Sequence, residues 1–190
     1  DQPRSRGLGD VYKRQDKSFQ KAAVVIWTTT PWTIPGNRAI AYSAEINYSM
    51  YKVESIAEHS TLRVGDQIIF ADELLENVKT QCKLLDLKKI SEVKDFGSFV
   101  CDHPFRKSGY NFDVKLYDAD FVTLEQGTGF VHIAPGHGAD DYILGVANNI
   151  DVPDTVDENG EYFDHVPLFN GKKIFNEDGS DADANIAVII

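Results

Sequence analysis

Two prolines four residues apart, Pro31 and Pro35, constrain the fold of this chain more than any other feature. Proline has no backbone N–H and restricts the residue before it to extended geometry, so we expect the run WTTTPWTIPGN at residues 27–37 to be non-helical. Its branched threonines have few side-chain rotamers and can form a narrow, polar wall around a small group. The same composition also fits a threonine-rich edge strand with two core tryptophans. The wall-forming candidates are Thr28, Thr29, Thr30 and Thr33, and Trp27, Trp32 and Asn37 flank them.

A second dense motif, GTGFVHIAPGHGADDY, occupies residues 127–142. Its first glycines allow tight turns, a strand then carries His132, and a glycine-rich loop leads into a helix that begins near Asp140. Carboxylates in the first turn of a helix suit the helix dipole, and we assign Asp140 a capping role. A carboxylate that is not a cap, such as that of Asp141, would point into a cleft and suit a cationic ammonium group.

Two histidines in this motif, His132 and His137, raise a zinc hydrolase as an alternative. Their spacing is not that of H-E-x-x-H on a helix, and a glycine-rich loop separates them, which makes this alternative the weakest. The sequence has no G-x-S-x-G elbow and no G-x-x-x-x-G-K-[ST] phosphate loop. Without a metal or a nucleophile, a positioned water could hydrolyse only an activated bond.

Short apolar runs between turns predict a mainly β fold with peripheral α-helices, arranged as a closed or half-closed barrel. We expect residues 38–42 and 48–54 to pair through the polar turn between them. Helical spacing predicts that Tyr142, Ile143 and Val146 lie on the inner face of a second helix. The predicted strands are residues 22–28, 38–42, 48–54, 67–70, 114–117, 121–124 and 130–133, and the predicted helices are 71–85, 139–148 and a short one at 186–190.

The composition is that of one globular domain: 190 residues, 42% of them hydrophobic and 26% charged. A formal net charge of −11 disfavours a protein that grips long stretches of nucleic-acid backbone, but it allows contact with a single nucleic-acid end. No apolar run is long enough to cross a membrane and no leader peptide precedes the domain, so we expect a cytoplasmic protein. Two cysteines, Cys82 and Cys101, are too few for a disulfide framework or a cysteine zinc site.

Residues 1–15, DQPRSRGLGDVYKRQ, differ from the rest of the chain, because they are basic and show neither helical nor strand periodicity. The string DVYKRQ is also the translation of GATGTGTATAAGAGACAG, which resembles a transposon end used in preparing sequencing libraries. We therefore interpret residues 1–15 as a non-native or disordered segment, with a native flexible tail as the alternative. The domain then spans residues 16–190, truncated at both ends.

Together the two motifs resemble the editing domain inserted in class I aminoacyl-tRNA synthetases for isoleucine, valine and leucine. WTTTPWTIPGNRAI is similar to the threonine-rich peptide of the bacterial isoleucyl enzyme, and GTGFVHIAPGHGADDY to its second editing motif, in which a histidine follows GTG-x-V. Leucyl and valyl relatives usually have methionine or lysine at position 132. The H-I-G-H and K-M-S-K-S signatures of the synthetic site are missing here. The resemblance therefore implies no cofactor in this fragment, and ATP and Mg²⁺ only for the synthetic site of the parent enzyme.

The resemblance implies post-transfer proofreading, in which the ester of valine wrongly attached to tRNA(Ile) is hydrolysed. Isoleucine and valine differ by one methylene and are the known example of a difference that one binding pocket distinguishes poorly, so a second sieve is needed. The implied partners are the 3′ end of tRNA(Ile) carrying valine and the remaining domains of the parent synthetase, with no membrane. A catalytically silent module that only docks the tRNA end is the alternative.

The family's functional residues map onto this chain through the two motifs. The resemblance implies that Asp141 binds the α-ammonium group and that His132 faces the substrate, either as a size gate against isoleucine or as a base. The remaining catalytic assignments are Thr28, Thr29 and Thr30, which would position substrate and water. Substrate contacts are implied for Trp27, Trp32, Thr33, Asn37, Gly127, Thr128, Gly129 and His137.

Overall fold

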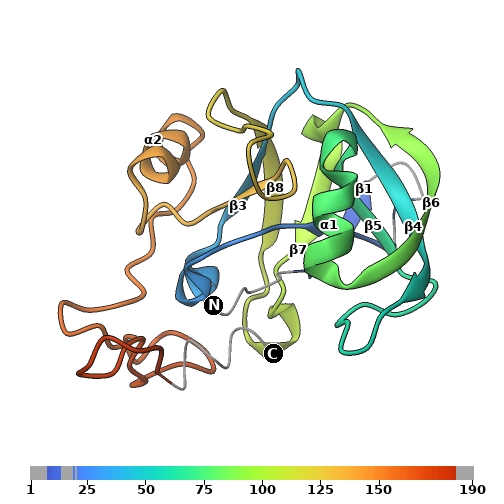
Figure 1. The fold of residues 1–190 in the computed structure, drawn as a ribbon. Coiled ribbons are helices and arrows are strands. Elements are labelled where there is room, and N and C mark those ends of the chain that lie inside the picture. Colours follow the sequence, from blue (N-terminus) through green and yellow to red (C-terminus); the bar gives the residue numbers. More distant parts are fainter. Residues whose placement is uncertain (1–7, 14–18, 20, 183–190) are drawn as a thin grey trace.

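The computed structural model describes residues 8–13, 19 and 21–182 (Figure 1). Nine strands are arranged in the order β6-β4-β5-β2-β1-β7-β8-β3-β9. Strand β1 pairs antiparallel with β2 on one side and with β7 on the other, and so joins two mixed sheets. The strands are β1 (Leu8–Lys13), β2 (Ala22–Val25), β3 (Ala39–Tyr42), β4 (Tyr48–Ile56), β5 (Gln67–Ala71), β6 (Leu84–Val93), β7 (Phe99–Asp102), β8 (Asp113–Asp118) and β9 (Val131–Ile133).

Helices are few and lie at the periphery, as predicted. Figure 1 shows α1 (Leu75–Cys82) beside β6 and α2 (Ala139–Ala147) on the opposite side of the molecule. The short 3-10 helices are η2 (Pro31–Gly36), η3 (Asp72–Leu74), η4 (Phe96–Ser98) and η5 (Arg106–Ser108). Among the described residues, no helix is long and apolar enough to span a membrane.

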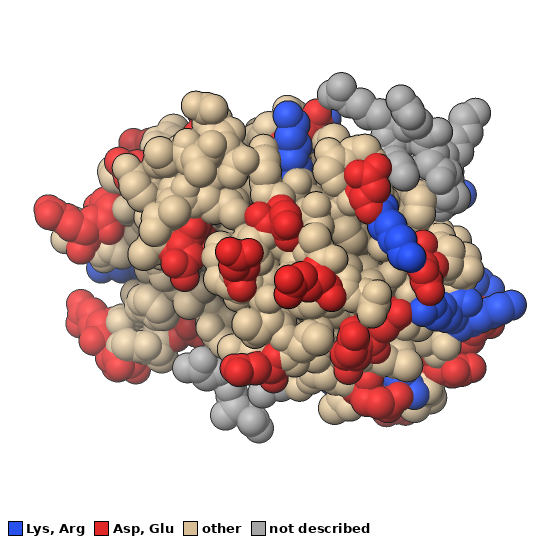
Figure 2. Space-filling view, turned by 90° about the horizontal axis from the view of Figure 1, so that it is seen from above, with Lys and Arg blue, Asp and Glu red and all other residues tan. Residues whose placement is uncertain are grey.

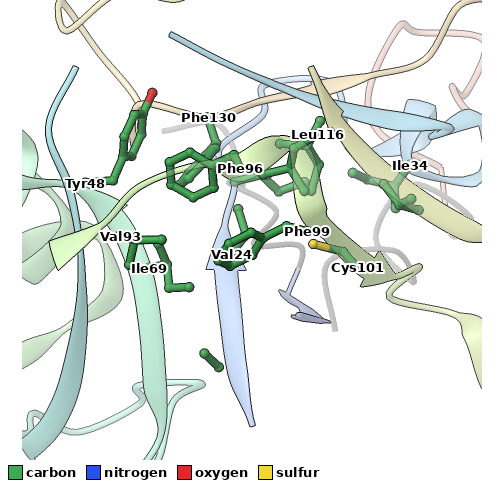
Figure 3. Close-up of a cluster of buried hydrophobic side chains, with 14 of the residues drawn as sticks. Val24, Ile34, Tyr48, Ile69, Val93, Phe96, Phe99, Cys101, Leu116 and Phe130 are labelled. Atoms are coloured by element: carbon green, nitrogen blue, oxygen red, sulfur yellow. The ribbon is translucent and has the colours of Figure 1, made fainter. Parts of the chain in front are cut away.

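The main core lies where the two sheets meet (Figure 3). Phe96 contacts Phe99 and Phe130 through tilted and edge-on ring packing, with centroids 5.2 and 5.5 Å apart. Tyr48 of β4 packs on the rings of Phe96 and Phe130. Aromatic pairs of this geometry stabilise beyond the area that they bury. This core fixes β4 and β7 relative to the loop that leads into β9.

The mainly β fold with peripheral helices is confirmed, but the described strands do not close into a barrel, since β6 and β9 end the order. The predicted pairing of residues 38–42 with 48–54 is wrong. Strand β3 pairs with β8 and β9, while β4 pairs with β5 and β6. The partners of β3, strands β8 and β9, lie much later in the chain, so a local turn pattern cannot predict this pairing.

Three further predictions are wrong in detail or untested. Residues 121–124 form no strand; they lie in the loop between β8 and β9, and their apolar pattern reflects the burial of Val122 there. The first helix ends at Cys82, where Lys83 adopts a left-handed conformation (φ 53°), and the strands β6 and β7 that come after it were not predicted. The predicted helix at 186–190 lies outside the described residues.

The second helix has the predicted bounds to within one residue but the wrong inner face. Tyr142, Ile143 and Val146 are exposed, whereas Leu144 and Gly145 are buried. A Cβ atom at Gly145 would lie 3.0 Å from the side chain of Pro135, so the glycine lets the helix approach this proline closely. The close contact between Gly145 and Pro135 therefore decides which face of the helix is buried, and the hydrophobic pattern of the sequence does not reveal this contact.

Residues 8–13 form β1, a strand that the sequence analysis did not predict. The backbone of this strand pairs with β2 at Leu8–Asp10 and with β7 at Val11–Lys13. The non-native origin of residues 1–15 concerns the DNA that encodes them, and it stays a prediction.

Candidate functional site

The fold brings the threonine-rich run and the glycine-rich motif into direct contact. The backbone N–H of Arg38 donates to the carbonyl of Ile133 over 2.8 Å, and β3 pairs with β9 so that Ile40 lies opposite His132. The first residues of the two motifs, Trp27 and Gly127, are also close together, since a Cβ atom at Gly127 would lie 3.9 Å from the Trp27 side chain. The two motifs thus lie against one another, and that they form one functional site stays a prediction.

The run between the two prolines is helical, contrary to the prediction. Residues Pro31–Gly36 form the 3-10 helix η2, with the N–H of Thr33 donating to the carbonyl of Thr30 over 3.0 Å. Pro31 occupies the first turn, where a helix has no use for the missing N–H. Pro35 removes one internal hydrogen bond, which a short 3-10 turn tolerates when other groups hold it.

The threonines differ in exposure. Thr28 is buried and its hydroxyl accepts the N–H of Thr30 over 3.0 Å, with the two hydroxyl oxygens 3.3 Å apart. Thr29 and Thr30 are exposed. Thr28 therefore shapes the backbone of the run, and Thr30 presents a hydroxyl beside it.

His132 lies at the centre of a hydrogen-bonded relay between the motifs. Because the Thr33 hydroxyl donates to the Thr30 carbonyl over 2.8 Å, its oxygen accepts the Nε2–H of His132 over 2.9 Å. The Asn37 amide lies 3.4 Å from Nδ1 of His132 and donates to the Ala39 carbonyl. This network assigns the proton of the neutral ring to Nε2. Burial, with a smaller contribution from the nearby His137, lowers the pKa of His132 to about 4.

Asp141 lies in the first turn of α2. Its Oδ2 accepts the backbone N–H of Ala134 over 2.7 Å, which ties the helix to the end of β9. Burial raises the pKa of Asp141, and Asp140 adds to the rise. The predicted capping role of Asp140 is wrong, because Gly138 is the N-cap residue and no side chain caps the helix. Asp141 is the half-buried carboxylate and Asp140 the exposed one.

His137 links η2 to the segment after α2. Its Nε2 lies 2.5 Å from the hydroxyl of Thr155, and its ring packs edge-on against Trp32 with centroids 5.0 Å apart. A Cβ atom at Gly36 would lie 3.0 Å from the His137 ring. Burial lowers the pKa of His137, while Asp154 raises it.

The GTG turn is anchored between strands. The Thr128 hydroxyl donates to the carbonyl of Val25 over 2.5 Å, and the Thr128 carbonyl accepts the N–H of Ala71 over 2.9 Å. Gly129 has a φ of +82°, and a Cβ atom there would overlap that of Ala71. Asn77 donates to the Gly127 carbonyl over 2.8 Å. These bonds fix the direction in which β9 leaves the turn.

Within the described part of the chain, no group of three or more histidine, cysteine, aspartate or glutamate residues is placed to hold a metal ion. The two histidines of the second motif each contact a threonine hydroxyl.

No model of a protein family matches the chain. The chain is 44% identical over 185 residues to isoleucine–tRNA ligase of Bradyrhizobium diazoefficiens, a match that covers 90% of this chain and 18% of that protein. It is 44% identical over 193 residues to isoleucine–tRNA ligase of Rhodopseudomonas palustris, covering 93% and 19%. The chain belongs to the isoleucyl-tRNA synthetase family. It spans less than a fifth of the length of these curated relatives.

The fold of this synthetase segment is that of an editing domain. It is similar to the editing domain of cytosolic leucyl-tRNA synthetase from P. knowlesi, with a TM-score of 0.57, 12% identity and coverage of 73% of this chain and 61% of that one. The corresponding P. falciparum domain gives a TM-score of 0.52 at 13% identity, covering 67% and 48%. At such low identity the similarity concerns the fold.

Sequence reasoning missed three side chains of this synthetase segment that hold the backbone of η2. Tyr162 donates its hydroxyl to the Trp32 carbonyl over 2.6 Å, and His103 lies 2.9 Å from the Ile34 carbonyl through Nε2. Arg38 donates to the carbonyls of Pro35 and Asn37. Tyr162 and His103 lie outside both motifs. A lone histidine or tyrosine among aromatic residues gave no signal that distinguishes such a contact from ordinary core packing.

Proposed function

We propose that this chain hydrolyses the ester that joins valine to tRNA(Ile), the post-transfer editing reaction of its family. The observation that carries the proposal is the Thr33–His132 hydrogen bond, which joins the threonine-rich run to the glycine-rich motif. A wall built in this way is stiff, because both side chains are buried and each has a second partner. A stiff wall can admit valine and exclude the larger isoleucine.

The half-buried carboxylate of Asp141 suits the α-ammonium group of the attached amino acid. A cation that approaches a carboxylate favours its ionised form and so opposes the effect of burial on the pKa. The bond to the Ala134 N–H engages Oδ2 and holds the carboxylate in one orientation. An ammonium group bound there would fix the position of the ester carbonyl next to it.

The hydrolysis itself needs little more than a placed water. The water oxygen attacks the ester carbonyl carbon, the bond between that carbon and the ribose oxygen breaks, and the ribose oxygen takes a proton. Valine and the free tRNA 3′ end result. An aminoacyl ester is already reactive, so orientation and stabilisation of the developing oxyanion supply much of the acceleration. The Thr30 hydroxyl and the Thr29 side chain, both exposed beside η2, are the groups that we assign to water and substrate.

His132 acts in this proposal as part of the wall, and not as a base. Its Nε2 proton is donated to Thr33, and its Nδ1 faces the Asn37 amide. A ring with both nitrogens engaged has no lone pair directed at a water. Its low pKa also makes it a weak base.

The proposed partners follow from the size of the relatives and from the charge of the surface. Figure 2 shows acidic side chains spread over the upper face of the molecule, with few basic ones. Such a surface suits contact with the 3′ end of tRNA(Ile), while the remaining domains of a parent synthetase hold the rest of the RNA. We expect ATP and Mg²⁺ to serve only the parent's synthetic site, and a cytoplasmic location.

The test is deacylation of preformed valyl-tRNA(Ile) and isoleucyl-tRNA(Ile) by this chain, with a chelator present. We expect rapid release of valine and slow release of isoleucine. Asp141→Ala should abolish the release of valine, and the adjacent, exposed Asp140→Ala is the matched control. Binding of both RNAs without release would favour the docking module, and activity that the chelator removes and zinc restores would favour the metal hydrolase.

A further inference from the structure

The carbonyl of Trp32 has lost its helical partner. In a 3-10 helix the N–H of residue i+3 donates to the carbonyl of residue i, so the donor to Trp32 would be the N–H that Pro35 lacks. The hydroxyl of Tyr162 donates to this carbonyl over 2.6 Å. Tyr162 is 1% exposed, and burial raises its pKa, so it keeps the proton that it donates. A side chain 130 positions away therefore replaces the bond that the proline removed.

A second donor, His103, binds the carbonyl of Ile34, two residues after Trp32 in η2. His103 follows β7 and is also 1% exposed. The N–H of Phe105 donates to its Nδ1 over 3.0 Å, so Nε2 carries the proton and donates to the Ile34 carbonyl over 2.9 Å. The ring stacks on Tyr110 with centroids 4.5 Å apart and planes at 10°. This packing and both hydrogen bonds fix the direction of the Nε2–H.

The two held carbonyls, those of Trp32 and Ile34, belong to the residues on either side of Thr33. Thr33 carries the hydroxyl that accepts from His132. A shift of η2 by a fraction of an ångström would lengthen this bond and open the wall. The donors come from separate parts of the chain, one from the loop after β7 and one from the turn-rich segment beyond α2.

We propose that Tyr162 and His103 are positioning residues that set how well the site discriminates valine from isoleucine, by holding the backbone on both sides of Thr33. Neither residue touches the substrate in this proposal. The inference rests on the proposed editing function and names residues outside its two motifs.

Tyr162→Phe tests the proposal, with Tyr110→Phe as the matched control. Tyr110→Phe keeps the ring that stacks on His103 and removes only a hydroxyl of a buried tyrosine, which donates to the backbone carbonyl of Pro167 over 2.8 Å. A merely structural role predicts the same effect for both variants. We expect similar losses of thermal stability, but a drop of about five- to tenfold in the ratio of kcat/KM for valyl- over isoleucyl-tRNA(Ile) in Tyr162→Phe alone.

His103 gives a second, independent test. In His103→Gln the longer amide can still present an N–H to the Ile34 carbonyl, whereas the shorter side chain of His103→Asn reaches only the Phe105 N–H. We expect Gln to retain most of the discrimination and Asn to lose it. An unchanged ratio in Tyr162→Phe, or equal ratios in the Gln and Asn variants, would overturn the proposal. Failure of the wild-type chain to release valine would instead overturn the editing function, and this inference with it.

Discussion

The hydroxyl oxygen of Thr33 lies 2.9 Å from Nε2 of His132, although 99 positions separate the two residues in the chain. The contact exists because β3 and β9 are neighbours in the sheet, with Ile40 opposite His132. The relay Asn37–His132–Thr33–Thr30 therefore depends on a pairing of distant strands. Any change that shifts β9 against β3 will shift the wall of the site.

Thr33→Val should destabilise the chain, because the variant keeps the shape of the side chain but leaves the His132 Nε2–H without its acceptor. A buried donor without a partner costs about 1–3 kcal/mol in the free energy of unfolding. Urea denaturation measures this loss. Thr80→Val is the control, since the Thr80 hydroxyl also donates to a backbone carbonyl but at the exposed surface of α1. Equal losses in both variants would contradict the relay.

Asp141→Asn should remove the charge while keeping the acceptor for the Ala134 N–H. We expect the rate of valine release to fall about 10- to 100-fold, in line with the loss of a charge-assisted hydrogen bond, with little change in stability. Single-turnover deacylation at saturating enzyme measures the rate. A variant that folds normally and retains full activity would exclude Asp141 as the ammonium ligand.

The rate of valine release should also fall as the solution is acidified, because protonation of Asp141 removes the charge that binds the ammonium group. Burial raises the pKa of this carboxyl above its ordinary value of 3.8. The midpoint of the fall should therefore lie above 3.8 in the free chain. Deacylation rates at low substrate concentration, measured from about pH 4 to pH 8, report this midpoint. Asp140→Asn should lower it, because Asp140 contributes to the rise.

Stability should fall between pH 6.5 and about pH 4, the ordinary and the folded-state pKa of two buried histidines. Burial lowers the pKa of His103 and of His132 from 6.5 to about 4, so in this window the unfolded chain binds protons that the folded chain does not. The stabilisation is complete above the ordinary pKa and is lost as the pH falls, on the order of 3 kcal/mol for each histidine. The raised pKa of Asp141 acts in the opposite direction and offsets part of the loss.

Urea denaturation at about pH 7.5 and about pH 4.5 checks this slope. In His103→Gln one titrating group is gone, so the difference between the two pH values should shrink, while His132 and His137, whose pKa values are also lowered, supply the remainder. A wild-type chain that is equally stable at both pH values would show that the two histidines do not stay neutral in the fold.

The sequence predicted well what depends on local pattern. The strands β2, β4, β5 and β8 and the helix α2 begin within two residues of their predicted positions. The expectation that the two motifs lie together also holds, since β3 pairs with β9 and Thr33 contacts His132. Strand β6 escaped prediction because its many charged side chains face solvent at the edge of the sheet, where an edge strand tolerates them.

What the sequence did not show are contacts made by one atom over a long sequence separation. The hydroxyl of Tyr162 and the Nε2 of His103 each hold one carbonyl of η2, and neither residue stands in a motif. The sequence did not predict the helical form of η2, because it too depends on such long-range contacts. Pro31 and Pro35 argue against a helix, but Pro31 lies in the first turn, where its missing N–H is not needed, and the Tyr162 hydroxyl replaces the donor that Pro35 lacks.

Gly129→Ala should be among the most damaging single substitutions in the chain. The residue has a φ of +82°, and the added Cβ atom would overlap that of Ala71. Left-handed strain and the clash together should cost about 2–5 kcal/mol in the free energy of unfolding. Gly179→Ala is the matched control, since its φ is +80° but nothing lies within 4 Å of the added atom, so only the strain of about 1–2 kcal/mol applies. Denaturation of both variants separates the clash from the strain, and equal losses would mean that the GTG turn does not press against β5.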